Sequence, residues 1–173
     1  MNNQLQVNLS EIVAFAEKHA EENIAFIQFL KQLNTETLDA IVHTLNEQIA
    51  PKIDCTICGN CCKSLMINVT EKEADALSNH LELSREKFDK QYLEKGSSGM
   101  MLINTIPCHF LEENKCTVYE YRFEGCKEFP AMHLPHFQQR LFTVFMHYDR
   151  CPIIFNVVEE LKVETKFMRN YEL

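Results

Sequence analysis

The sequence predicts an α+β fold that is mostly α-helical, with small strands and loops around a core of cysteine side chains. Both ends of the chain show apolar residues at helical spacing, whereas the middle holds only short apolar runs of the kind that form strands. All eight cysteines lie between residues 55 and 151. With 173 residues, 46% of them hydrophobic, the chain is suited to one domain, 1–173. We expect a helical hairpin in residues 1–50, a cysteine-cluster core in 51–152 and a C-terminal helix in 153–173.

The N-terminal region has the pattern of two amphipathic helices. The first runs over about residues 9–33, in two segments, and Asn8 or Ser10 is suited to cap its start. A break at Asn34 precedes the second helix, which Pro51 ends. Its apolar stripe consists of Leu38, Ile41, Val42, Leu45 and Ile49. Packing in a core explains both stripes.

Further elements are predicted on both sides of a flexible loop at residues 96–99. Residues 65–69 are a strand candidate, and Thr70 with Glu73 forms a capping box that opens a helix to about Leu81. Ser84 caps another helix. We expect its inner face to carry Phe88, Tyr92 and Leu93.

The C-terminal half combines short apolar runs with one last helix. Three runs are predicted as strands, namely residues 101–103, 108–111 and 116–119. Residues 141–146 fit a strand or a helix equally well. Pro152 stands where the first turn of the last helix begins.

Composition and charge exclude several functions. The net charge of −8, without clustered Lys or Arg, argues against nucleic acid and against an anionic membrane as partners. The N-terminus has no basic region followed by an apolar one, and no apolar run reaches the roughly 18 residues of a membrane span. We therefore expect a cytoplasmic protein, whose only foreseeable partner is another protein.

Four cysteines fall within eight residues, Cys55, Cys58, Cys61 and Cys62, and four more follow at Cys108, Cys116, Cys126 and Cys151. Spaced thiols on a short loop are suited to bind a metal ion, and Gly59 permits the tight bend that they need. Four disulfides are the alternative. The vicinal pair and a reducing cytosol argue against them. A thioredoxin-like role is disfavoured because no βαβ pattern surrounds the first C-x2-C.

The spacing also suggests how the cysteines divide. Cys55, Cys58 and Cys61, with the remote Cys151-Pro152, follow the ferredoxin pattern for a four-iron cluster. Cys61 and Cys62 are adjacent, and neighbouring side chains in an extended segment point in opposite directions, so we expect these two to serve different centres. Cys62, Cys108, Cys116 and Cys126 are then left for a second site. Zinc and iron, including a 4Fe–4S cluster, both suit such sites, in one or two centres.

The order of these motifs resembles the CxxCxxCC cysteine-cluster family of bacterial proteins, which is described as zinc- or iron-chelating. The resemblance extends over about residues 55–152 and includes Tyr119, Arg122 and Phe129-Pro130. It implies that all eight cysteines bind metal, without supplying a reaction. A similar cluster occurs in flagellin lysine methylases. The sequence departs from the pattern at Phe123, where Pro is typical, and at Lys127, where Arg is typical.

Other residues have competing interpretations. Four histidines in the cysteine-bearing half are alternative zinc ligands, although surface or supporting roles fit them better: His109, His133, His136 and His147. Tyr119 and Arg122 either donate hydrogen bonds toward thiolate sulfur or form a structural pair with Glu120 or Glu124.

We thus expect a metal-binding protein that chelates zinc or iron through eight cysteines. The alternatives are an iron–sulfur redox or protein-modifying enzyme and a metal-trafficking protein.

Overall fold

The computed structural model describes residues 5–167, and it is mostly helical with small antiparallel sheets. The predicted fold class is thereby confirmed. The chain forms two compact units. The helical unit contains residues 5–54 and 130–167, and the cysteine unit contains residues 55–129. The two ends of the chain thus build the helical unit together, while the single domain predicted from the sequence stays a prediction.

Within its described residues the helical unit contains helices and no strand. Its first part contains α1 (Leu9–Lys18), α2 (Ala20–Leu30), α3 (Thr35–Ile49) and the 3-10 helix η1 (Ala50–Lys52). Its second part contains η3 (Phe137–Arg140), α9 (Leu141–Met146) and α10 (Pro152–Glu164). The side chains of Asn8 and Asn34 accept hydrogen bonds from the first turns of α1 and α3. The two predicted segments of residues 9–33, the end of α3 just before Pro51 and the start of α10 at Pro152 are thus confirmed.

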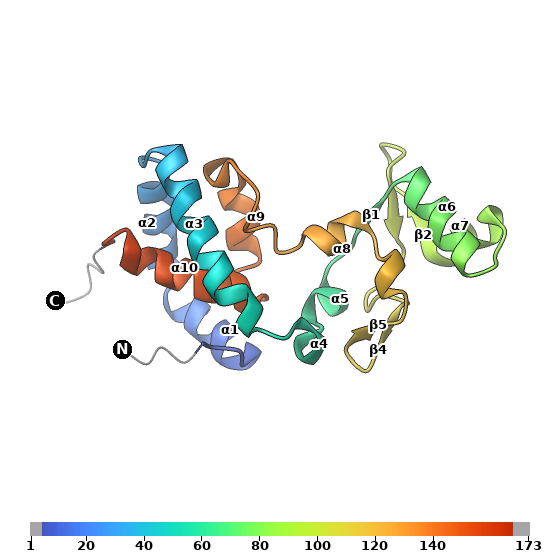
Figure 1. Ribbon diagram of the computed structural model, residues 1–173, viewed down its shortest axis with the longest axis horizontal. Helices are drawn as coiled ribbons and strands as arrows, with labels where there is room; N and C mark the ends of the chain where they lie inside the picture. Colours follow the sequence, from blue (N-terminus) through green and yellow to red (C-terminus); the bar gives the residue numbers. More distant parts are fainter. Residues whose placement is uncertain (1–4, 168–173) are drawn as a thin grey trace. The chain divides into compact units, whose positions relative to one another are not determined.

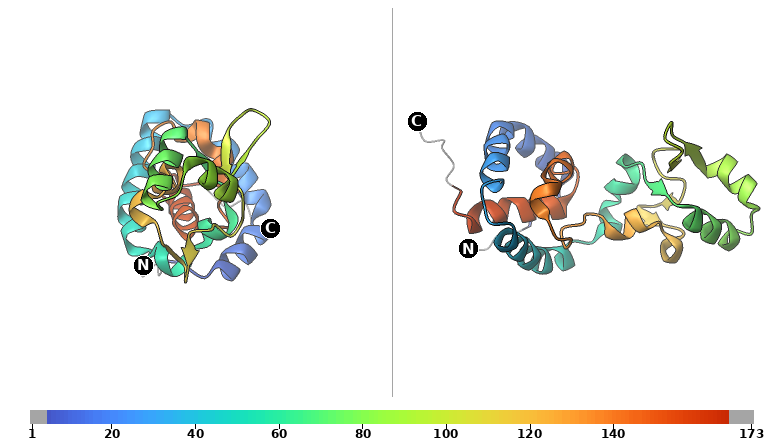
Figure 2. Two further views of the ribbon diagram at one scale, coloured as in Figure 1. Left: turned by 90° about the vertical axis from the view of Figure 1, so that its right-hand side faces the viewer. Right: turned by 90° about the horizontal axis from the view of Figure 1, so that it is seen from above.

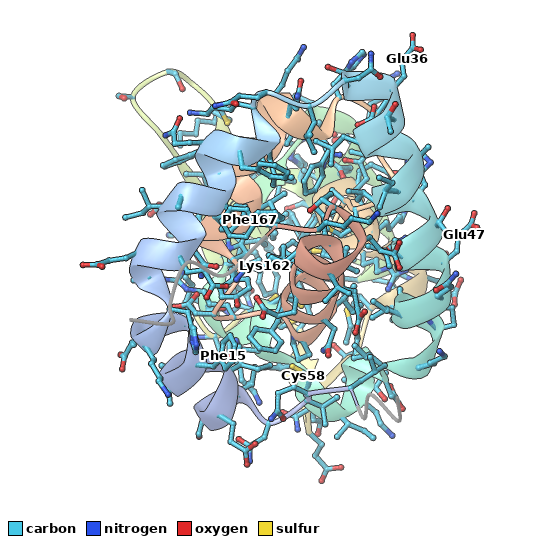
Figure 3. All side chains as sticks on the ribbon, turned by 90° about the vertical axis from the view of Figure 1, so that its left-hand side faces the viewer. Phe15, Glu36, Glu47, Cys58, Lys162 and Phe167 are labelled. Carbon is cyan, nitrogen blue, oxygen red and sulfur yellow. The ribbon has the colours of Figure 1, made fainter. Side chains whose placement is uncertain are left out.

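Helix α10 is the centre of the helical unit. Figure 3 shows it between α2 and α3, with Lys162 pointing toward α2. Most of its residues are buried, including Ile154 and Leu161, so that it is apolar on nearly every face. A helix of this kind has to be surrounded by other helices.

One buried ionic network joins α10 to α2. The Lys162 ammonium lies 2.8 Å from a Glu22 carboxylate oxygen and 2.7 Å from a Glu159 oxygen. It also donates to Asn23 at 2.7 Å, and the Tyr148 hydroxyl donates to Glu159 at 2.6 Å. Because the side chains of Lys162 and Glu22 are 3% and 2% exposed, each charge depends on the others.

The segment before α9 is bound to α3 by polar contacts. The Asp39 carboxylate accepts hydrogen bonds from the backbone N–H groups of His136 and Phe137 at 2.7 and 2.8 Å. Gln138 donates to the carbonyl of Leu30, the last residue of α2, and to that of Leu33. These bonds hold residues 136–140 against the N-terminal helices.

The cysteine unit consists of shorter elements. Its helices are α4 (Cys55–Cys58), α5 (Asn60–Ser64), α6 (Glu71–His80), α7 (Arg85–Tyr92), η2 (Tyr119–Tyr121) and α8 (Glu124–Glu128). Its strands are β1 (Asn68–Val69), β2 (Leu93–Lys95), β3 (Met101–Ile103), β4 (Leu111–Glu112) and β5 (Lys115–Cys116). The chain path is visible in Figure 1.

A small antiparallel sheet carries the core of the cysteine unit. Its order is β1-β3-β2, with Val69 opposite Met101 and Leu93 opposite Ile103. These residues pack with Phe88 of α7 and other buried apolar side chains. The loop at residues 96–99 projects from the end of β2 and β3 (Figure 2). The predicted capping box is present, since Thr70 and Glu73 exchange hydrogen bonds at the start of α6.

Several predicted elements differ from those observed. The predicted strand at 65–69 contains only β1, and the pair at 108–111 and 116–119 is reduced to the two-residue strands β4 and β5. Residues 119–121 are a 3-10 turn. Leu93 is the first residue of β2, although the apolar spacing placed it on α7. Residues 141–146 are helical.

Candidate metal centre

The first two cysteines lie at the ends of a single helical turn. Cys55 and Cys58 bound α4, and the Gly59 N–H donates to the Cys55 carbonyl at 2.8 Å. Gly59 has φ 58°, a left-handed conformation that separates α4 from α5. A Cβ at this position would lie 3.0 Å from Cβ of Asn114. Glycine is therefore required twice, for the backbone conformation and for the close approach of Asn114.

Asn114 connects this turn to the β4–β5 hairpin. Its side-chain amide donates to the carbonyl of Ile57 at 3.2 Å. The hairpin carries Cys116, which lies opposite Leu111 in the pair of strands. The bond of Asn114 therefore holds the turn of Cys55 and Cys58 next to the hairpin of Cys116.

Cys61 and Cys62 both lie in α5, and their sulfur atoms are 3.9 Å apart. The prediction that they point in opposite directions assumed an extended segment, and it is wrong because the segment is helical. Consecutive helical residues are separated by about 100°, which leaves both thiols on one side. The reason given for assigning them to different centres is thereby removed. The Cys62 carbonyl also accepts the N–H of Cys108 at 2.8 Å.

Three further thiols are held by the core of the cysteine unit. Cys108, Cys116 and Cys126 are half-buried and pack against its apolar residues. Cys126 lies in α8, which begins where the Glu124 N–H donates to the Glu73 carboxylate at 2.6 Å. Glu73 thus caps α6 and positions the helix of Cys126 at the same time.

These thiols act on one another electrostatically. A hydrogen bond from Cys62 lowers the pKa of Cys61 to about 6, and the same bond, with burial, raises the pKa of Cys62. Burial, then repulsion from Cys116 and Cys61, raises the pKa of Cys108. Burial, then repulsion from Cys108, Cys61 and Cys116, raises the pKa of Cys126 to about 12. Repulsion from neighbouring thiolates thus contributes to the raised pKa values of Cys62, Cys108 and Cys126.

The donor set is suited to zinc or iron. A bound cation favours the thiolate form and offsets the repulsion, and soft sulfur ligands select zinc and iron–sulfur centres. Among residues 5–167, no three side chains of His, Cys, Asp or Glu already converge tightly enough to hold an ion. The helical turns and two-residue strands anchor the backbones of these cysteines.

Arg122 lies close to the same thiols. Its guanidinium carbon is 3.9 Å from the centre of the Tyr119 ring. Its charge contributes to lowering the pKa of Cys61 and acts against the rise in the pKa of Cys126. Neither interpretation of Arg122 from the sequence is observed: among residues 5–167 its guanidinium makes no hydrogen bond to a thiol and no ion pair with Glu120 or Glu124, and Glu124 contacts Lys127 at 3.4 Å instead.

The histidines and Cys151 have other surroundings. His109 contacts Asn104 at 2.7 Å, while His133, His136 and His147 belong to the helical unit. Cys151 also belongs to the helical unit, where it is buried and precedes α10. The role of all eight cysteines as metal ligands stays a prediction.

The site thus defines a class of protein that gathers cysteines from distant segments into a soft-metal site. The family model CxxCxxCC, a "Putative zinc- or iron-chelating domain", matches residues 54–152. This match covers more than half of the chain, which therefore belongs to the CxxCxxCC family. Comparison with curated proteins found no match, and comparison with solved structures found none either.

Sequence reasoning missed two positioning residues. Asn114 carried no predicted role, yet it holds the α4 turn. Glu73 was identified as a helix cap, while its bond to Glu124 is a long-range contact. The only signal in the sequence was the residue type, because both contacts join segments far apart in the chain.

Proposed function

We propose that this protein chelates zinc or iron through its eight cysteines, as a metal-binding protein of the cytoplasm. The observation that carries the proposal is the gathering of five cysteines, from α5, the segment at residue 108, β5 and α8, in one compact unit. A bound cation favours the thiolate form of such thiols and thereby stabilises the unit that holds them.

The proposed ligands have two kinds of surroundings. Cys61, Cys62, Cys108, Cys116 and Cys126 are half-buried, which favours a closed site that keeps its metal. Cys55 is exposed and Cys58 is half-buried. Eight thiolates suffice for two four-coordinate centres, and the metal content per chain distinguishes two centres from one.

The cytoplasmic location rests on the chemistry of the thiols, because reduced cysteines need a reducing compartment. Within residues 5–167, no helix has both the length and the apolar character needed to cross a membrane. We propose a protein partner rather than nucleic acid or membrane, in keeping with the net charge of −8.

The test is the metal content of protein purified without oxygen, with its acid-labile sulfide and absorption spectrum. Zinc without colour identifies a thiolate zinc site, whereas iron with sulfide and absorption at roughly 400 nm identifies an iron–sulfur cluster. The variant Cys108→Ser is expected to lose metal, as is Cys151→Ser if all eight cysteines are ligands. The control variant His133→Ala keeps its metal. Absence of zinc and iron from the purified protein, and failure to bind added metal, would contradict the proposal.

A further inference from the structure

Arg122 differs from the other described arginines because its guanidinium has neither a carboxylate partner nor a hydrogen-bond acceptor. Arg85, also in the cysteine unit, pairs with three carboxylates, those of Glu71, Asp75 and Asp89. Arg140 donates to backbone carbonyls, and Arg150 pairs with Asp149. Within residues 5–167, the guanidinium of Arg122 makes no ion pair and no hydrogen bond. A half-buried guanidinium of this kind is suited to meet an anionic group.

The backbone and a tyrosine ring fix the place of this charge. Arg122 follows the 3-10 helix η2 in extended conformation, and its N–H donates to the Tyr119 carbonyl at 3.4 Å. The guanidinium is stacked on the Tyr119 ring with 3.9 Å between its carbon and the ring centre. A planar cation held on an aromatic face loses little further conformational entropy when it binds an anion, whereas a flexible lysine loses more.

Arg122 lies next to the helix that carries Cys126. Its neighbour Phe123 is the N-cap residue of α8, and the Phe123 carbonyl accepts the N–H of Cys126 at 2.9 Å. In keeping with this position, the charge of Arg122 contributes to lowering the pKa of Cys61 and acts against the rise in the pKa of Cys126. The neighbouring carboxylate of Glu124 is directed to Lys127 at 3.4 Å instead. The thiolate site therefore offers the negative charge that Arg122 can offset.

We infer that Arg122 is the charge-compensating residue of the metal centre, held in position by the ring of Tyr119. A divalent ion bound by four thiolates leaves two negative charges, and a nearby guanidinium offsets one of them in a partly buried site. This inference rests on the proposed function and specifies how the same site tolerates its charge.

The experiment uses the full-length protein, stripped of metal and reduced, with Co²⁺ alone as the probe. Co²⁺ replaces zinc in thiolate sites and reports thiolate coordination through its absorption. Competition with a chelator gives the affinity for wild type, Arg122→Met, Arg122→Lys, Tyr119→Phe and Tyr119→Ala. Lys90→Met is the matched control, since it removes one exposed charge from α7 of the same unit.

Arg122→Met is expected to lower Co²⁺ affinity about 10- to 100-fold, the usual effect of losing a residue that supports metal ligands. The loss should shrink as salt rises, because screening weakens the charge effect. Arg122→Lys should recover part of the affinity, Tyr119→Phe should match wild type and Tyr119→Ala should lie between wild type and Arg122→Met. Lys90→Met should match wild type.

The outcomes separate this inference from the proposed function. If the wild-type protein binds no Co²⁺, both the role of Arg122 and the proposed metal-binding function are wrong. Arg122→Met that binds Co²⁺ as tightly as wild type overturns the role of Arg122 alone. A loss that is the same at every salt concentration, with Arg122→Lys as weak as Arg122→Met, also overturns it, because it reveals a packing role. Thermal unfolding of the metal-free variants identifies any general loss of stability.

Discussion

The two units of this protein differ in how their buried polar groups are compensated. In the helical unit, the charge of Lys162 is matched by Glu22 and Glu159, within contacts of 2.8 and 2.7 Å. In the cysteine unit, neighbouring thiols contribute to raising the pKa values of Cys62, Cys108 and Cys126. Arg122 has no carboxylate partner among the described residues.

The difference shows where each unit obtains its stability. The α-helices of the helical unit have 6 to 15 residues, and with α10 buried on nearly all faces they give this unit an apolar core of its own. The cysteine unit has a smaller core and three strands of only two residues, so that a metal ion contributes more to its folding. Metal dependence should therefore be local rather than global.

Removal of metal should have the largest effect and should separate the units. A strong chelator is expected to abolish protection from hydrogen exchange in residues 55–129, because the cysteines lose the ion that joins them. Helices α3 and α10 of the helical unit should stay protected. Hydrogen exchange resolved by segment measures this. Equal loss of protection in both units would show that the metal stabilises the whole chain.

Lys162→Met should produce the largest effect in the helical unit. The substitution leaves two carboxylates near each other in an interior where Glu22 is 2% exposed, and it should lower the free energy of unfolding by about 3–5 kcal/mol. Urea unfolding measures the loss, and metal content should not change. The double variant Lys162→Met, Glu22→Met should recover part of it; no recovery would mean that packing, not charge, is responsible.

Gly59→Ala should have an intermediate effect on the cysteine unit. Alanine at φ 58° is strained, and its Cβ would lie 3.0 Å from that of Asn114, which should cost about 1–2 kcal/mol and weaken metal binding. Gly99→Ala is the matched control, with φ 79° but no atom within 4 Å. Metal affinity should fall only in the first variant. An equal decrease in both would show that backbone strain, and not the contact with Asn114, is the cause.

Glu73→Gln should have the smallest effect, about 1 kcal/mol, because one oxygen cannot replace two that accept from Thr70 and Glu124. Burial alone would raise the pKa of Glu73, but the hydrogen bonds from Glu124 and Thr70 outweigh it and lower the pKa below 4.5. Its contribution is thus complete above pH 4.5 and is lost as the pH falls through the lowered pKa.

The pH dependence supplies the measurement for Glu73. Unfolding of wild type and variant in urea at neutral and acidic pH should give a difference that disappears in acid. A difference that persists at low pH would mean that the ionised carboxylate is not the stabilising form.

Much of the helical unit was predictable, because its signals are local. Asn34 caps α3, Pro51 follows its end and Pro152 opens α10, all of which depend on neighbouring residues alone. Thr70 and Glu73 belong to the same class. The family, and with it the zinc- or iron-chelating character, was recognised from the order of the cysteines.

The cysteine unit was less predictable, because its elements are too short for periodicity to be read. Two residues of β5 cannot show an alternation, and nothing near Cys61 distinguishes a turn of helix from an extended segment. The contact of Asn114 with Ile57 depends on the folding of residues far apart in sequence. Similarly, no sequence pattern indicates that Arg122 stacks on Tyr119 without a carboxylate partner.

The order of the units along the chain has a final consequence. Residues 55–129 interrupt the helical unit, so the two parts of this unit can pack only when the ends of the inserted loop of about 75 residues come together. When the loop is unfolded, its closure has an entropic cost that grows with the logarithm of its length, by about 0.6 kcal/mol per doubling. A cation that orders this loop removes most of its chain entropy beforehand. Metal binding by these cysteines should thus speed the packing of α3 against α10, although neither helix contains a residue of the loop.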